Sequence, residues 1–137
     1  MTGEVWAFDA ADGRLRWMFQ TSGLVGSSVA IAYGTAYFGS FDSTLYAVDA
    51  ITGVRKWSLR TSGAILASPA VANGVVFVST MDGHILAADA GSGAILWDYS
   101  AGGLVSASPT IADGKLFVGS NEIPSPDNML RVFEVSE

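Results

Sequence analysis

The sequence contains no cysteine and a single histidine, His84, among its 137 residues. The absence of cysteine excludes disulfides, thiolate metal sites and cysteine nucleophiles, and it leaves the redox compartment undetermined. Charged residues are also scarce, at 15%. The 13 acidic and 7 basic side chains give a net charge of -6, and no lysine or arginine cluster offsets it. Because such a surface repels phosphate backbones, nucleic acid is not an expected partner.

Long uninterrupted apolar runs are missing as well. The stretch from Trp17 to Phe41 carries no charge, but four glycines and frequent serines and threonines interrupt it. A spanning helix needs about 20 predominantly apolar residues, so we expect no membrane span. The opening segment MTGEVWAFDA has neither a basic nor a continuous apolar region, so no signal peptide is expected in this chain. The chain is interpreted either as cytoplasmic or as an internal piece of a longer protein.

Half of the residues are hydrophobic, which suffices for a core, and they recur with a period of forty residues. The chain is predicted to be one partial domain, 1–137, with repeats at 5–44, 45–84 and 85–129 and a partial repeat at 130–137. Nine columns are identical in the three full repeats: Ala7/Ala47/Ala87, Asp9/Asp49/Asp89, Ala10/Ala50/Ala90, Gly13/Gly53/Gly93, Trp17/Trp57/Trp97, Gly23/Gly63/Gly103, Ser28/Ser68/Ser108, Ala32/Ala72/Ala112 and Gly34/Gly74/Gly114.

Each repeat holds four short apolar runs separated by glycine-bearing turns, which indicates strands. One such set is predicted at Leu66–Ala72, Val75–Thr80, Ile85–Ala90 and Ala94–Tyr99, with turns at 73–74, 82–83 and 91–93. Residues 75–78 are apolar on both faces, which suits a strand between two sheets. We therefore predict an all-β fold, a β-propeller of four-stranded antiparallel blades. Because propellers close with about 4 to 8 blades, the chain is an incomplete arc of about three blades.

The pattern Ala-x-Asp-x-x-x-Gly-x-x-x-Trp occurs at 7–17, 47–57 and 87–97. It resembles the tryptophan-docking repeat of the pyrroloquinoline-quinone (PQQ) family of β-propellers. An aspartate carboxylate bonds turn N–H groups, glycine permits unusual backbone angles, and an indole can cover the next blade while its N–H finds a carbonyl. The expected structural docking residues are Ala7, Asp9, Gly13, Trp17, Ala47, Asp49, Gly53, Trp57, Ala87, Asp89, Gly93 and Trp97.

The resemblance also implies the blade phase. The chain would open with strands three and four of one blade, hold two whole blades and end with strands one to three of another, which makes about thirteen strands. The first and last blades would then expose apolar faces, and the isolated chain would tend to associate.

No catalytic, cofactor-binding or metal residue is expected in this chain. In quinoprotein dehydrogenases the resemblance implies a vicinal disulfide, which a chain without cysteine cannot form. The repeated aspartates, tryptophans and serines are interpreted as structural because a site needs one such residue and not three. His84 is interpreted as a solvent-facing hairpin residue with no acidic partner.

The departures from the repeat are candidate contact surfaces. An insertion within the third repeat contains Asn121, Glu122, Asp127 and Asn128, and it is either a contact loop or a tolerated surface insertion. Phe41 and Met81 replace polar residues at a turn, where they could form an apolar rim for a partner or pack against a neighbouring blade.

The predicted function is a non-catalytic PQQ-repeat segment that serves as a binding or scaffolding module for protein–protein interaction. Its partners would be further propeller blades, another copy of the chain, or a different protein. The alternative is a fragment of a PQQ-dependent alcohol or sugar dehydrogenase, using PQQ and calcium, whose catalytic residues lie outside this chain. The resemblance implies a periplasmic or other extracytoplasmic location.

Overall fold

The structure is a computed structural model that describes residues 1–102, 105, 107–121 and 128–134. These residues form thirteen β-strands and no helix. The strands are β1 (Gly3–Phe8), β2 (Leu15–Thr21), β3 (Ala30–Ala32), β4 (Thr35–Ser40), β5 (Thr44–Asp49), β6 (Arg55–Arg60), β7 (Ala70–Ala72), β8 (Val75–Ser79), β9 (His84–Asp89), β10 (Ile95–Ser100), β11 (Thr110–Ala112), β12 (Lys115–Asn121) and β13 (Asn128–Glu134).

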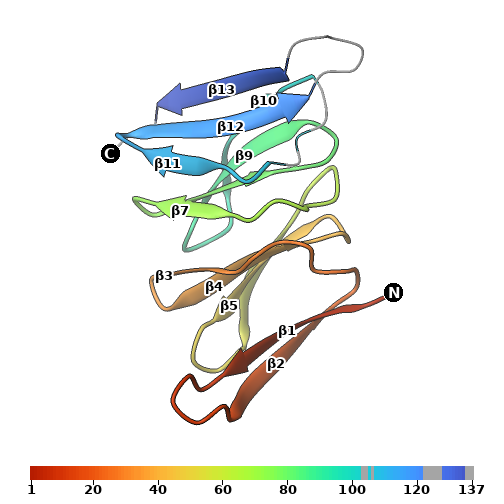
Figure 1. The fold of residues 1–137 in the computed structure, drawn as a ribbon, viewed down its shortest axis with the longest axis vertical. Helices are drawn as coiled ribbons and strands as arrows, with labels where there is room; N and C mark the ends of the chain where they lie inside the picture. Colours follow the sequence, from red (N-terminus) through yellow and green to blue (C-terminus); the bar gives the residue numbers. More distant parts are fainter. Residues whose placement is uncertain (103–104, 106, 122–127, 135–137) are drawn as a thin grey trace.

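The strands form four antiparallel sheets in chain order. The first blade is β1–β2, the second β3–β6, the third β7–β10 and the fourth β11–β13. Figure 1 shows these sheets stacked from β1–β2 at the bottom to β11–β13 at the top. The all-β fold and its incomplete, propeller-like arrangement are confirmed. The observed phase, with two whole blades between two partial ones, is the one that the family resemblance implies.

Glycine-bearing turns separate the strands because the chain must enter the left-handed region there. Asn73 and Gly74 both have positive φ, at 50° and 74°, which is the requirement of a tight primed hairpin turn. Asp49 caps the turn between β5 and β6: its Oδ1 accepts hydrogen bonds from the N–H groups of Ile51 and Thr52, both at 2.9 Å. These bonds, that of Thr52 first, lower the pKa of Asp49.

The core lies between the blades. One cluster joins side chains of the second and third blades, and similar clusters join the first blade to the second and the third to the fourth. The buried members of the first of these clusters are Tyr37, Leu45, Ala47, Ile65, Val76, Val78, Leu86 and Ala90. Burial of these faces supplies the main driving force that holds successive sheets together.

The predicted first strand of the third blade is too long. It runs over Ala70–Ala72 rather than Leu66–Ala72. The residues before it bond to other segments: Ile65 N–H donates to the Ser40 carbonyl at 3.0 Å, and Met81 N–H donates to the Ala64 carbonyl at 2.8 Å. The segment therefore crosses from one blade to the next before the ladder begins at Ala70.

Candidate functional site

The repeated contact between blades is made by tryptophan. Trp17 on β2 donates its Nε1–H to the Ala50 carbonyl at 3.0 Å, and Trp57 on β6 donates to the Ala90 carbonyl at the same distance. In both cases the acceptor lies 33 residues further along the chain, in the following blade. One indole thus connects each of these blades to its successor.

A glycine lies beneath each of these rings. A Cβ added to Gly53 would lie 2.6 Å from the Trp17 ring, and one added to Gly93 would lie 2.6 Å from the Trp57 ring. Both glycines also have positive φ, at 72° and 77°. Two independent constraints, ring contact and backbone angle, therefore require glycine here.

The small alanines lie on the strand next to each indole. Ala7, Ala47 and Ala87 are the direct cross-strand partners of Trp17, Trp57 and Trp97 respectively. The Trp97 ring is tilted against the Phe77 ring, with 6.0 Å between centroids. Alanine leaves room for the ring to lie across the sheet.

The repeated aspartates all cap turns. Asp89 Oδ1 accepts from the N–H groups of Ser92 and Gly91, each at 2.9 Å, and these bonds, chiefly that of Ser92, lower the pKa of Asp89. Asp9 bonds the Ala11 N–H at 2.8 Å and the Arg16 guanidinium, and the arginine contributes most to lowering its pKa. These carboxylates are therefore ionised at neutral pH.

The first blade differs from the others at its outer face. Gly13 has φ of 73°, like Gly53 and Gly93, but a Cβ there would meet no atom within 4 Å. Phe8 on β1 is 58% exposed, whereas its equivalents Val48 and Ala88 are each 0% exposed. Within the described residues, the outer face of the first blade is therefore exposed.

A serine ladder also crosses the blades. Ser28 N–H donates to Ser68 Oγ at 2.8 Å, and Ser68 N–H donates to Ser108 Oγ at 2.9 Å. The sequence showed the recurrence of these residues but not this pairing, because each bond joins residues forty positions apart. Like the indole contacts, these serine bonds join each repeat to the next.

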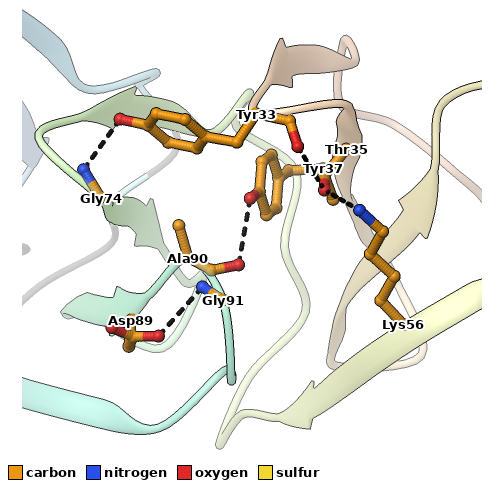
Figure 2. A pocket seen from close by; sticks show the side chains of 8 residues that line it. All are labelled: Tyr33, Thr35, Tyr37, Lys56, Gly74, Asp89, Ala90 and Gly91. Atoms are coloured by element: carbon orange, nitrogen blue, oxygen red, sulfur yellow. Dashed lines mark hydrogen bonds between the residues drawn. The ribbon is translucent and has the colours of Figure 1, made fainter.

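A pocket of about 350 Å³ lies between the second and third blades. It is lined by Tyr33, Thr35, Tyr37, Lys56, Gly74, Asp89, Ala90 and Gly91 (Figure 2). The Tyr37 hydroxyl donates to the Ala90 carbonyl at 3.0 Å, the carbonyl that Trp57 also reaches. Burial raises the pKa of Tyr37, so its hydroxyl stays protonated at neutral pH.

Two longer side chains of the second blade border the pocket. Tyr33 accepts the Gly74 N–H on its hydroxyl oxygen at 2.8 Å, and Lys56 Nζ donates to Thr35 Oγ1 at 2.8 Å. Sequence reasoning missed this pocket. The signal that could have found it is that several of its lining residues differ from their equivalents in the other repeats, whereas Gly74, Asp89 and Ala90 occupy columns that all repeats share.

The comparisons with known proteins agree with this geometry. The family model described as "Outer membrane protein assembly factor BamB" matches residues 1–68 and again residues 61–136. The chain belongs to this family. No curated protein sequence matches this chain.

Solved structures place the chain as one part of longer propellers. BamB from Moraxella catarrhalis is 27% identical, with a TM-score of 0.74, over 86% of this chain and 36% of that one. The quinohemoprotein alcohol dehydrogenase ADHIIG from Pseudomonas putida HK5 is 25% identical, with a TM-score of 0.75, over 85% of this chain and 25% of that one. This chain therefore spans about a third of the BamB structure that it matches.

A designed protein shares the fold over nearly the whole chain. The computationally designed Ika4 protein superposes with a TM-score of 0.84 and 21% identity, covering 98% of this chain and 81% of the other. Its likeness concerns the fold alone.

The interpretation of His84 in this BamB-type chain needs a correction. His84 opens β9, and its Nδ1 lies 2.7 Å from Asp98 Oδ1 on β10, so it does have an acidic partner. This hydrogen bond raises the pKa of His84. The side chains are 30% and 45% exposed, so the pair is neither buried nor fully solvent-facing.

The contact residues predicted from the insertion are only partly described. Asn121 and Asn128 are partners at the ends of β12 and β13, whereas Glu122 and Asp127 lie outside the described residues. Phe41 and Met81 are both exposed at the predicted turns. The contact role of these residues stays a prediction.

Proposed function

We propose that residues 1–137 form one partial PQQ-repeat β-propeller domain that acts as a non-catalytic binding or scaffolding module. The observation that supports this most is the outer face of the first blade, where the residues that form the indole-docking surface elsewhere in the repeat are exposed. Gly13 and Ala10 hold the positions that Gly53 and Ala50 hold beneath Trp17. Family membership makes a protein-interaction role the natural use of such a face.

This exposed face is also apolar. Trp6 and Phe8 on β1 stack with their rings 6.3 Å apart, and Met18 and Leu15 on β2 are their cross-strand neighbours. All four side chains are exposed. A contiguous apolar patch of this kind marks an interaction site.

The occupant is a blade of the same repeat type that carries an indole at the docking position. Such a ring would cover Gly13, and its N–H would reach the Ala10 carbonyl. A further blade of a longer chain and a second copy of this chain present the same chemistry.

We expect the isolated chain to self-associate in sedimentation equilibrium and the Phe8→Glu variant to do so at least tenfold more weakly, because a carboxylate would be buried in an apolar contact. Ile51→Glu is the matched control: Ile51 is 83% exposed in a turn, so its replacement leaves association unchanged. A chain that stays monomeric at high concentration, or a Phe8→Glu variant that associates like the parent, argues against the proposal.

The alternative function is a segment of a PQQ-dependent dehydrogenase, which the resemblance to ADHIIG favours. The residues present do not fit the quinone site. The chain has no cysteine, and Asp9, Asp49 and Asp89 bind turn N–H groups. Dye reduction by a longer chain that contains this segment, in the presence of PQQ and calcium, would favour the alternative.

We also propose an extracytoplasmic location, supported by the description of the family as an outer membrane protein assembly factor. Within the described residues there is no helix of the length and apolarity that a bilayer crossing requires.

A further inference from the structure

The pocket between the second and third blades is not a product of the repeat. Its Gly74, Asp89 and Ala90 belong to columns shared by all repeats, and these residues maintain the turns and the indole contact. Its other polar residues depart from the columns. Where the next repeat has Asn73, Val75, Phe77 and Leu96, the pocket has Tyr33, Thr35, Tyr37 and Lys56. The fold can be built without them, as the third blade shows.

Tyr33 adopts a backbone conformation that is unusual for its type. Its φ is 54°, close to the 50° of Asn73 and the 51° of Asp113 at the same turn. Asparagine and aspartate enter this region readily, whereas an aromatic residue there is an outlier that suggests a function. The Tyr33 ring lies along the pocket in Figure 2, fixed by the Gly74 N–H, and its hydroxyl hydrogen is left for another acceptor.

Gly91 lines the pocket and also departs from the repeat. The equivalent residues of the other two repeats are Ala11 and Ile51. A Cβ on Gly91 would meet only Asp89 Oδ1, at 3.3 Å, and Gly91 has no positive φ that demands glycine. Neither a close backbone contact nor the backbone angle therefore requires glycine at this position.

The pocket carries two opposite charges that do not pair with each other. Figure 2 shows Lys56 and Asp89 at opposite ends of it, and none of the ion pairs among the described residues joins them. Lys56 uses one of its three donors on Thr35. The hydrogen bonds that Asp89 accepts all reach Oδ1, so Oδ2 is available to a ligand.

We propose that this pocket binds a short peptide of two or three residues with free termini. The peptide carboxylate would contact Lys56, its ammonium would contact Asp89 Oδ2, and its backbone would lie between these ends beside the tyrosines. A tripeptide extends over about 10 Å, so its two charges lie at its ends rather than on one carbon. A neutral sugar would leave both charges unmatched, and phosphate would meet one cation and a carboxylate.

Isothermal titration of the whole chain with trialanine tests the proposal. We expect millimolar or tighter binding, and at least tenfold weaker binding of N-acetyl-trialanine and of trialanine amide, because each loses one charge-assisted contact. Lys56→Leu and Gly91→Ile introduce residues that the chain itself carries at Leu96 and Ile51, so the fold is expected to tolerate both. Each should weaken trialanine binding at least tenfold. Arg55→Leu, a neighbouring exposed cation outside the pocket lining, should leave it unchanged.

Testing each variant with the peptide that lacks the matching charge distinguishes a lost contact from damage to the fold. Lys56→Leu should not further weaken the amide, and Asp89→Asn, which keeps an oxygen acceptor for the turn, should not further weaken the N-acetyl peptide. The proposal is overturned if trialanine gives no heat at millimolar concentration. It is equally overturned if glucose or inorganic phosphate binds as tightly as trialanine. It is also overturned if the loss of binding affinity caused by a variant adds to the loss caused by blocking the matching peptide terminus.

Discussion

Replacing Trp57 by alanine is expected to lower the free energy of unfolding by about 3 kcal/mol, the lower end for a large aromatic side chain. The ring covers Gly93 and is tilted against the Tyr37 ring at 5.9 Å, so its loss leaves a void between the second and third blades. Urea unfolding followed by circular dichroism measures the change. Trp6→Ala is the control: Trp6 is 49% exposed on the outer face of the first blade, and its loss should cost far less.

The indole N–H can be separated from the ring. Trp57→Phe keeps an aromatic cover over Gly93 and should cost about 1 kcal/mol beyond the change in size. The Ala90 carbonyl still accepts from Tyr37, so it is not left unpaired. Adding Tyr37→Phe removes that second donor, and the double variant should lose more than the sum of the two single variants. Costs for Trp57→Ala and Trp6→Ala that are equal would contradict the assigned role of Trp57.

Replacing Gly93 by alanine is expected to cost about 3 kcal/mol, whereas Gly13→Ala should cost only about 1 to 2 kcal/mol. Both glycines have similar φ, 77° and 73°, so the two variants share the backbone strain. Only Gly93 lies beneath an indole, and its new Cβ would lie 2.6 Å from the Trp57 ring. The difference between the two losses of stability therefore measures the displacement of the ring.

The Gly13→Ala and Gly93→Ala variants must be compared at low protein concentration, because self-association through the first blade would change the free energy of unfolding measured for Gly13→Ala. Under those conditions equal losses at Gly13 and Gly93 would show that the ring contact contributes nothing. A larger loss at Gly13 would contradict the account in the same way.

Column identity predicted the blades because the same turns and interfaces recur in each repeat, whereas the blade phase came from the family resemblance. Gly53 and Trp57 occupy columns that are identical in all three repeats, which predicted a turn at the glycine and a contact between blades at the tryptophan. The contact between Trp17 and Ala50 was expected in kind. Its partner could be named only from the structure, since the bond joins residues 33 positions apart.

The features that sequence reasoning missed depend on register and on departures from the repeat. His84 is paired with Ser100 in the β9–β10 ladder, which makes Asp98 its diagonal neighbour on the same face. A register shift between Ile95 and Trp97 hides this relation in the sequence. The pocket was missed for another reason: Lys56 of the second blade and Asp89 of the third lie far apart in the chain, and only the stacking of two blades brings them to one cavity.

Hydrogen exchange of the indole Nε1–H groups, followed by NMR, tests most directly whether one tryptophan docks each blade upon the next. Trp17 and Trp57 donate to backbone carbonyls between blades, so their Nε1–H groups should exchange only through opening of the interface. Trp6 bonds the exposed Glu4 carboxylate instead, and its Nε1–H should exchange orders of magnitude faster. Exchange of Trp57 as fast as that of Trp6 would contradict blade docking by tryptophan.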